Sequence, residues 1–487
     1  MASSSLPDWA LLDRCIFEES FPADEPTEAT CTNSREDEIR ICFQLHAPPR
    51  PSSIYLSWPA GKGEFHNFFV LAAHHDAVLF QMMYPISVPG REFSIMYDYI
   101  LYTVGDDGGG SIRPSLQLLP SVDGTMTEFK ALFEKGMYRL TSQRLRRIEG
   151  LDLGVLRLGE DCAVVELQID KFGEIQLELH VLYPLRSGSC RWQTVYPKIT
   201  IHGNSGIDLE TLLWNWSADT VVPIGSYLCW VDYCLGGILL CDVFGGSFDL
   251  DYLPFPAKMP DLDRDQHGRL WADVYQTVGV NEDNDVIKFI LVVRGDGNMI
   301  EDRFVPDFGF IATSWTLKIT APQRDWEIDA IIESDDLWNL DAFALLPHTS
   351  LQFSLVSMAD PNIIYFTLRE KGAEDVGYEY DDIWLVGIDM PNKAVNSSCR
   401  YVMGKDENLY PEEAKFAKAK YWYFEPFIPT DLPKYLKHGI SSANELGTLL
   451  PVLASAEVIG AGAEGDFLEL PHRGEADAQV ESFVVQG

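Results

Sequence analysis

The feature that most constrains the fold of this chain is the run from Tyr227 to Pro256, YLCWVDYCLGGILLCDVFGGSFDLDYLPFP. Its apolar, β-branched and aromatic segments are cut by Gly, Asp and Pro, which is the pattern of short strands joined by tight turns. Three strand signals fall in this one stretch, and two more distant stretches repeat the pattern. The run therefore predicts architecture first: strands in closely spaced groups.

Strand signals come in clusters along the rest of the chain. One strand taken from each successive cluster recurs at a spacing of roughly 60 to 75 residues, in the range of irregular propeller blades with inserted loops. The strands compared are those near Tyr102, Val164, Trp230, Phe289 and Tyr365. A tryptophan close to the end of several units stands where a kelch-like blade places a packing aromatic. These tryptophans are Trp192, Trp315 and Trp326.

We therefore expect a mainly β protein, a kelch-like or F-box-associated-like β-propeller of about six irregular blades of antiparallel strands. Two β-sandwich-like domains with the same number of strands are the alternative. Apolar residues at helical spacing predict a few short connecting or capping helices, within 125–137, 207–216 and 410–422. The second of these is entered through Asp208.

Composition divides the chain into four parts. Residues 1–36 are polar and acidic and are expected to form an N-terminal arm. Residues 37–205 are expected to hold the first blades, and residues 206–437 the later blades. Residues 438–487 are rich in Ala, Gly and Glu, which predicts a flexible tail.

Charge and cysteine content restrict the partners and the compartment. The chain has 37 basic and 74 acidic side chains, a formal charge of −37, which repels nucleic acid phosphates and anionic lipid. We expect no nucleic acid partner and no membrane, because no apolar stretch is long enough to span a bilayer. The start of the chain lacks a signal peptide pattern, and nine scattered cysteines do not form a disulfide framework. A soluble protein of the cytoplasm and/or the nucleus is expected.

Two clusters of polar residues resemble metal ligands. His74 and His75 precede Asp76, but successive residues of a strand point to opposite faces, so a turn or strand-end polar cluster is the favoured interpretation. The alternating carboxylates that begin at Asp261 resemble the start of a calcium loop. Gln266 stands where that loop needs Gly, so a solvated acidic loop is favoured there.

No short catalytic or cofactor motif is present. Cys229, Cys234 and Cys241 lack zinc-site spacing and lie in apolar strands, which favours core positions. The segment GDDGGG at 105–110 lacks the Lys and Ser/Thr of a phosphate-binding loop and is interpreted as a hairpin loop. We assign no catalytic, cofactor-binding or metal-binding residue and expect no cofactor.

The chain resembles a known family at the stretch WVDYCLGGILLCDVF followed by LDYLPFP (230–256). These residues are similar to the signature of the domain-of-unknown-function family 1618, DUF1618, a plant family expanded in cereals. The resemblance continues through VIKFILV (286–292), DPNIIYFTLRE (360–370), DIWLVGIDMPNKAV (382–395) and FIPTDLPKYL (427–436). Members of the family often carry Arg just before the first Gly of the signature, whereas this chain has Leu235.

The family resemblance implies no established activity. It implies an architecture like the β-propeller-like domains attached to plant F-box proteins, and hence a recognition surface. The start of this chain shows no F-box-like helical pattern, so a role as a ubiquitin-ligase adaptor does not carry over directly, although ubiquitin-ligase components stay among the candidate partners.

Two functions follow as hypotheses. The leading one is a non-enzymatic module that recognises an unknown protein partner, with Trp58, Trp271 and Trp384 as candidate anchors in loops. The alternative is a hydrolase of a carbohydrate or small ester that uses two carboxylates gathered from loops at one end of the propeller.

Overall fold

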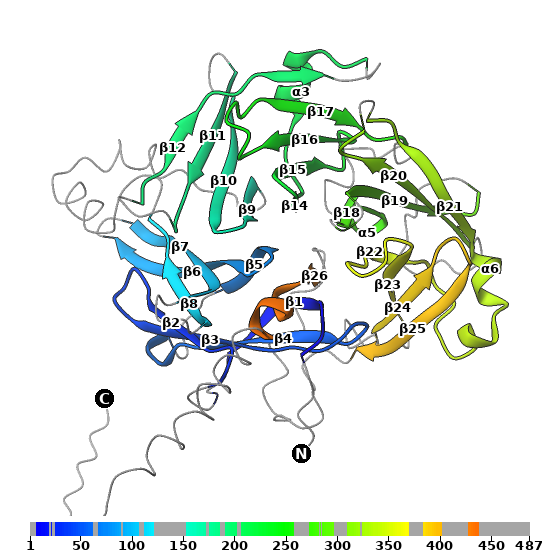
Figure 1. Ribbon diagram of the computed structural model, residues 1–487, viewed down its shortest axis with the longest axis horizontal. Helices are drawn as coiled ribbons and strands as arrows, with labels where there is room; N and C mark the ends of the chain where they lie inside the picture. The colour runs from blue at the N-terminus through cyan, green and yellow to red at the C-terminus, as the bar shows by residue number, and fades with distance from the viewer. Residues whose placement is uncertain are drawn as a thin grey trace, which may run out of the picture. The chain divides into compact units, whose positions relative to one another are not determined.

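Six small sheets stand in a ring in the computed structural model, so the described chain is a six-bladed β-propeller (Figure 1). This confirms the predicted fold class. The structure describes residues 6–18, 21, 25–61, 67–88, 91–106, 112–120, 152–171, 175–185, 190–201, 206–257, 272–281, 283, 285–296, 309–321, 324–369, 383–401 and 427–437. The chain divides into two units, Met1–Ala443 and Asn444–Gly487, and all described residues belong to the first.

In each of the first three blades the strands lie side by side, and the innermost strand is named first and the outermost last. Blade 1 has β26 (Phe427–Thr430), β1 (Ala10–Glu18), β4 (Pro51–Ser57), β3 (Glu38–Gln44) and β2 (Ala29–Thr32). Blade 2 has β5 (Asn67–His74), β6 (Ala77–Val88), β7 (Arg91–Asp106) and β8 (Ile112–Leu118). Blade 3 has β9 (Leu153–Leu158), β10 (Asp161–Asp170), β11 (Gln176–Leu182) and β12 (Gln193–Val195).

The last three blades have the same outward order. Blade 4 has β14 (Thr220–Ile224), β15 (Tyr227–Asp232), β16 (Gly237–Asp242), β17 (Leu250–Pro254) and, outermost, β13 (Ile199–Ile201). Blade 5 has β18 (Gln276–Asn281), β19 (Val286–Arg294), β20 (Phe310–Lys318) and β21 (Glu327–Glu333). Blade 6 has β22 (Gln352–Val356), β23 (Ile363–Arg369), β24 (Ile383–Asp389) and β25 (Ala394–Tyr401).

Short helical segments lie between strands at η1 (Pro59–Gly61), α3 (Leu209–Asn215), α5 (Ala272–Tyr275), α6 (Ser334–Trp338) and η4 (Asp341–Phe343). The helix α3 falls within the predicted 207–216, and the Asp208 carboxylate accepts a hydrogen bond from the Thr211 N–H at its start. The predicted helices at 125–137 and 410–422 lie outside the described residues. The glycine-rich segment 107–110 does as well, but it joins β7 to β8, which pair as antiparallel neighbours.

The N-terminal region differs from the expected polar arm. Strands β1 and β2 both lie within the first 36 residues and belong to blade 1. Leu11 and Leu12 are fully buried there. The polar arm was expected because the residues after the short apolar stretch are acidic. Burial of that apolar stretch, WALL (residues 9–12), against blades 6 and 1 stabilises the strand despite the acidic residues that follow it.

Blade packing explains why the signature strands are apolar along their whole length. On β15, Cys229 and Val231 pack in one core cluster with blade 5, whereas Leu228 and Trp230 pack in another with blade 3. A strand covered on both faces reads as a continuous apolar run and not as an alternating one. Burial also places Cys229 in the core as predicted and raises the pKa of its thiol.

The two glycines of the signature are required at their positions for different physical reasons. Gly236 has a φ of +83°, a left-handed conformation that glycine adopts without strain. Gly237 has no such backbone, but a Cβ there would lie 2.4 Å from the Tyr252 ring on the neighbouring strand. The turn between β15 and β16 is closed further by the buried Asp232 carboxylate, which accepts from the Leu235 N–H.

Two of the three predicted packing tryptophans join consecutive blades in the same way. The Trp192 indole donates to the Pro120 carbonyl oxygen at 2.7 Å, and the Trp326 indole donates to the Pro254 carbonyl oxygen at 2.9 Å. In each pair the tryptophan precedes the fourth strand of its blade, and the proline follows or ends the fourth strand of the blade before. Trp315 differs, because it lies within β20 and packs in the core.

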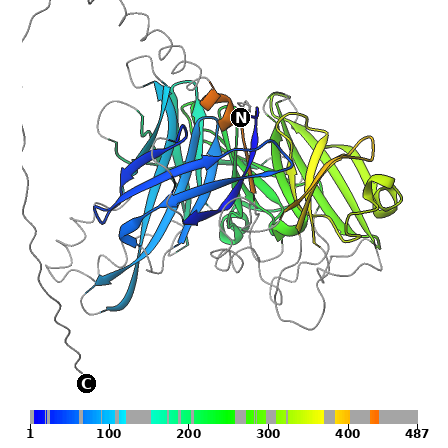
Figure 2. The ribbon, with the colours of Figure 1, turned by 90° about the horizontal axis from the view of Figure 1, so that it is seen from below.

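The ring closes between blade 6 and blade 1. The C-terminal strand β26 pairs antiparallel with β1, which itself runs parallel to β4. Phe427 of β26 is 1 % exposed and packs with Trp9, Tyr365 and other apolar residues from both blades. Closure therefore brings the two ends of the described chain together in one blade (Figures 1 and 2).

The substitution Phe427→Ala tests this closure. We expect a loss of about 3–5 kcal/mol in the free energy of unfolding, because a buried aromatic is removed at the joint between two blades. Leu345→Ala is the control, since Leu345 is 88 % exposed and its loss should change the free energy of unfolding by less than about 0.5 kcal/mol. Urea unfolding of both variants provides the measurement, and equal effects would contradict the closing role of Phe427.

Candidate functional site

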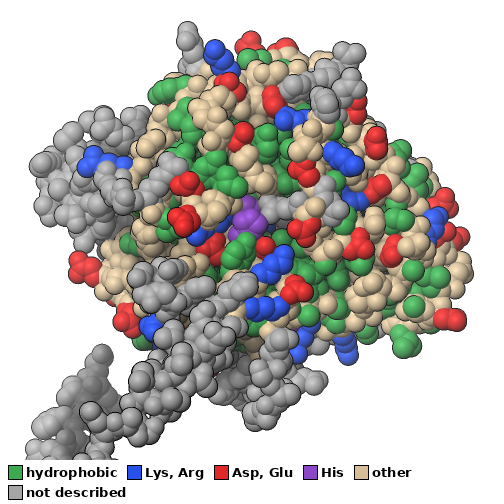
Figure 3. Space-filling view, in the orientation of Figure 1, with side chains coloured by type: hydrophobic (Ala, Val, Ile, Leu, Met, Phe, Trp, Pro, Cys, Tyr) green, Lys and Arg blue, Asp and Glu red, His purple; other side chains and the backbone are tan. Residues whose placement is uncertain are grey.

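The cavity at the centre of the ring is the candidate site. It has a volume of about 80 Å³ and is lined by the inner strands of blades 1, 2, 4, 5 and 6. Figure 3 shows a hollow near the middle of this face with histidine side chains beside it. Because each of these blades contributes its innermost strand, the site exists only in the closed ring.

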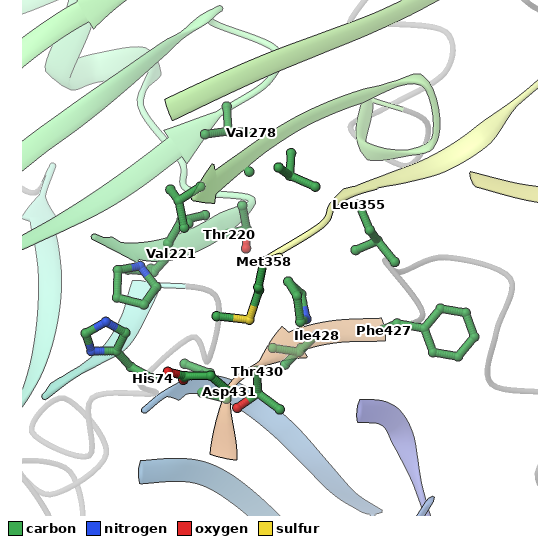
Figure 4. Close-up of a pocket in the computed structure, with 18 of the residues that line it drawn as sticks. His74, Thr220, Val221, Val278, Leu355, Met358, Phe427, Ile428, Thr430 and Asp431 are labelled. Carbon is green, nitrogen blue, oxygen red and sulfur yellow. The ribbon is translucent and has the colours of Figure 1, made fainter. Parts of the chain in front are cut away.

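The walls of the cavity are mainly aliphatic. Val221, Val278, Leu355, Met358 and Ile428 come from four different blades and surround it (Figure 4). The polar lining residues are fewer and gather on the side of blades 1 and 2. They are Arg14, His74, His75, Thr430 and Asp431, with Thr220 and Thr277 from blades 4 and 5.

The turn between β5 and β6 places the two histidines. His74 is the last residue of β5, and His75 has a φ of +53°. The imidazole rings of the two residues stack at 4.0 Å with an interplanar angle of 27°. The prediction of a turn or strand-end polar cluster is confirmed, but the expectation that both side chains point to opposite faces is wrong. The left-handed backbone of His75 breaks the strand alternation on which that expectation depended.

Arg157 of β9 binds this turn to blade 3. Its guanidinium donates to both carboxylate oxygens of Asp76, at 2.6 and 2.9 Å, and its backbone N–H donates to His74 Nδ1 at 2.9 Å. Asp76 is 3 % exposed, so the ion pair is shielded from water. Burial disfavours the charged guanidinium, but the bonds to Asp76 raise the pKa of Arg157 above its ordinary value.

Asp431 binds the same turn to the C-terminal end of the described chain. Its carboxylate lies 3.1 Å from His75 Nδ1 and 3.9 Å from Lys434 Nζ. Asp431 directly follows β26 and precedes the helical residues 432–437, and the Tyr435 ring lies 5.6 Å from the His75 ring. The polar side of the cavity is therefore the place where the closing strand is fixed to blade 2.

The chemistry available in this cavity is limited. Glycoside hydrolysis uses two carboxyl groups about 5–9.5 Å apart, and Asp431 is the one carboxylate among the described lining residues. The volume of about 80 Å³ is also well below the several hundred Å³ of a typical small-molecule site. Across the described ranges, no group of three or more His, Cys, Asp or Glu side chains is arranged to hold a metal ion.

The three tryptophans predicted as partner anchors do not meet at this cavity. Trp58 is 6 % exposed, and its indole donates to the Asp37 carboxylate at 3.2 Å. Trp384 is half-buried on β24 and packs against the core. Trp271 lies outside the described residues, as do the acidic positions Asp261, Asp263 and Asp265. An anchoring role for these tryptophans stays a prediction.

Sequence reasoning did not find Arg157, Asp431 or the role of the closing strand. The pattern FIPTDLP contains no strand longer than four residues, and nothing local indicates that it pairs with a segment more than 400 positions earlier. The signal that was available is the doublet His74 and His75 next to Asp76, because a polar cluster at a strand end needs partners when it is buried.

Residues 230–365 match the model of a family described as Protein of unknown function (DUF1618). The match supports the DUF1618 resemblance over the stretch that carries the signature. It begins in β15 and ends in β23, so it covers blade 5 and parts of blades 4 and 6. No curated protein matches the chain.

Several solved structures are distantly similar to the chain. The WD40 domain of SCAP from fission yeast has 10 % identity and a TM-score of 0.31, with 75 % of this chain and 72 % of that one covered. A glycosyl hydrolase from Bacteroides ovatus has 10 % identity and a TM-score of 0.27, covering 79 % and 96 %. A levansucrase mutant from B. subtilis has 9 % identity and a TM-score of 0.28, covering 71 % and 90 %. Similarity this low says nothing about function.

Among the described residues, no helix is both long enough and apolar enough to cross a membrane.

A double-mutant cycle tests the ion pair beside the cavity. We expect Arg157→Met to lower the free energy of unfolding by about 3–5 kcal/mol, because the buried Asp76 carboxylate loses its charged partner. Asp76→Asn combined with Arg157→Met should cost clearly less than the sum of the two single changes, since no unpaired charge is then buried. Urea unfolding of the three variants measures the coupling, and strictly additive losses would contradict a buried ion pair.

Proposed function

We propose that this protein is a non-enzymatic recognition module whose closed β-propeller body binds a partner protein. The composition of the central cavity carries the proposal. The described lining is mainly aliphatic, and its one carboxylate is placed against His75 and near Lys434, where it fixes the closing strand. Asp431 is therefore engaged in holding the closing strand, and the described lining offers no second carboxylate with which it could form a glycosidase pair.

The architecture supports recognition in a second way. A ring whose blades share buried cores is rigid, and rigid scaffolds present loops and edges for binding with little ordering cost. Several large apolar side chains are exposed on the outside of this body. They include Tyr196 at 63 %, Trp214 at 57 %, Ile328 at 61 % and Leu345 at 88 % exposure.

The family resemblance gives the proposal its context. We infer a plant protein of the DUF1618 type that works in the cytoplasm and/or the nucleus, in keeping with its scattered cysteines and strong negative charge. A net charge of −37 favours partners with basic surfaces over nucleic acid or anionic lipid. The hydrolase hypothesis stays a prediction, and no feature of the described cavity favours it.

Capture of partners from native tissue tests the proposal. The tagged full chain and a tagged chain of residues 1–443 are compared by affinity purification and mass spectrometry. We expect both to capture the same reproducible set of proteins, because the whole ring lies in the first unit. Ubiquitin-ligase components in that set would identify an adaptor role.

Two results would count against the proposal. If nothing exceeds the background of a tag-only control, the purified protein should be screened for hydrolysis of carbohydrates and small esters, and turnover there would replace recognition with catalysis. If partners are captured only by the full chain, recognition depends on residues 444–487 and the propeller body is not sufficient.

A further inference from the structure

The outer edge of blade 5 exposes large apolar side chains. Its outermost strand, β21, pairs with one neighbour, β20, in the described part of the chain, as the outermost strands of the other blades do with theirs (Figure 1). Ile328 and Ile331 on this strand are 61 % and 46 % exposed. Large apolar side chains on an unpaired strand are a liability, which native proteins usually avoid unless a partner covers them.

The register of β21 places the two isoleucines on one face of the sheet. Ile328 is opposite Trp315 of β20, and Ile331 is opposite Thr313, so both share the face of alternate β20 residues. They share it although they are three positions apart, because a bulge adds Asp329 between the two pairings. The bulge thus brings two exposed isoleucines into one small apolar patch at the edge.

Carboxylates flank the two isoleucines along the sequence. The segment RDWEIDAIIESDD (324–336) carries six acidic residues. Asp329 and Asp336 are paired with Lys288 and Lys393. The other four form no ion pair within the described residues. These four are Asp325, Glu327, Glu333 and Asp335.

Two other outer edges of the ring avoid an unpaired strand with exposed apolar side chains. At blade 4 the chain covers its own edge, because β13 pairs with β17 as an additional strand. At blade 6 the edge strand β25 is polar where it is most exposed, at Asn396, Ser398 and Arg400. The edge of blade 5 has no further strand over it in the described part of the chain, and it exposes two isoleucines among its acidic residues.

We propose that β21 binds an extended segment of a basic partner protein, which adds a strand to blade 5, covers the two isoleucines with apolar side chains and places Lys or Arg beside the carboxylates that lack an ion pair. Backbone pairing would supply affinity, and the isoleucine patch with its acidic border would supply specificity. This inference rests on the proposed recognition function and names the chemistry of the partner.

Negative charge disfavours binding of β21 to either of two other segments: β21 of a second copy, and the C-terminal segment of the same chain. In a second copy of this chain, an antiparallel β21 paired about Ala330 would bring Glu327 and Glu333 of the two strands opposite each other, and like charges directly opposed are destabilising. The sequence of the chain's own C-terminal segment, residues 444–487, has eight Asp and Glu against one Arg, so its charge does not complement the acidic border either. A basic segment from another protein satisfies both the apolar patch and its border.

Binding of a synthetic peptide to the full chain tests the proposal. The probe is a labelled peptide of about ten residues in which Lys or Arg alternates with Val or Ile, and its counterpart carries Glu at every basic position. We expect the basic peptide to bind and the acidic one not to bind. Affinity should fall several-fold between about 50 and 300 mM salt, since the attracting charges are exposed. Hydrogen exchange should show protection over residues 327–333 and none over 394–401, the comparison edge.

A matched pair of variants locates the site. Ile331→Lys places a positive charge in the patch. It should weaken the affinity for the basic peptide by about tenfold or more, because the new charge repels the peptide's Lys or Arg residues. Leu345→Lys adds the same charge at another exposed position and should leave affinity within about twofold. Thermal unfolding equal to that of the unchanged protein establishes that both variants are folded.

Three outcomes overturn the inference: no binding of the basic peptide, protection at a segment other than 327–333, or equal binding of the acidic peptide. Light scattering that shows a dimer through this edge would also overturn it, because a second copy would then be the occupant. If tissue partners are captured while the peptide fails, the recognition function stands and only the assignment of this edge is lost.

Discussion

The structure depends on the pairing of β26 with β1, which joins blade 6 to blade 1 through four residues near the C-terminal end of the described chain. Each blade buries both of its faces against neighbours, so an open ring would expose the inner faces of two blades to water at once. The strand is short, and backbone pairing alone could not hold it. The side chains that hold β26 in place are Phe427, which is buried between blades 6 and 1, and Asp431, which follows the strand and contacts His75.

The same closure explains the polar cluster beside the cavity. Asp431 reaches His75, whose ring stacks on His74, and His74 accepts a bond from the Arg157 backbone, while Arg157 holds Asp76. Three blades are thereby connected at one point by groups that would be costly to bury singly. A buried network of this kind specifies one arrangement more than it stabilises it, which suits a ring that must close in a single register.

The parts of this structure that local sequence predicts are those governed by local physics. The apolar run of β15, the Asp208 cap of α3 and the glycine turn before β16 all follow from residues within a few positions of one another. The strand clusters predicted the blades for the same reason, because hairpins are local. The short segment FIPT shows the limit. Its partner in β1 is set by closure of the whole ring, and no periodicity within four residues carries that information.

The candidate site was less accessible from sequence than the fold. The doublet His74 and His75 drew attention to the correct turn, but the strand rule separated side chains that the left-handed residue brings together. The role of Arg157 is equally hidden, since a lone arginine in LRLGE resembles any solvated side chain. Residues whose purpose is to join distant blades are defined by the ring and are recognised only once the ring is assembled.

The large negative charge is best understood together with the outer edges. A propeller removes edges at its centre but leaves one outer strand per blade, each with backbone groups ready to pair with another chain. An acidic border opposes pairing between copies, because every copy carries the same sign. It does not oppose a basic strand, and it increases the rate at which one arrives. In the proposed strand addition at blade 5, the same acidic border therefore opposes pairing between copies and favours a basic partner, so solubility and specificity would have one physical cause.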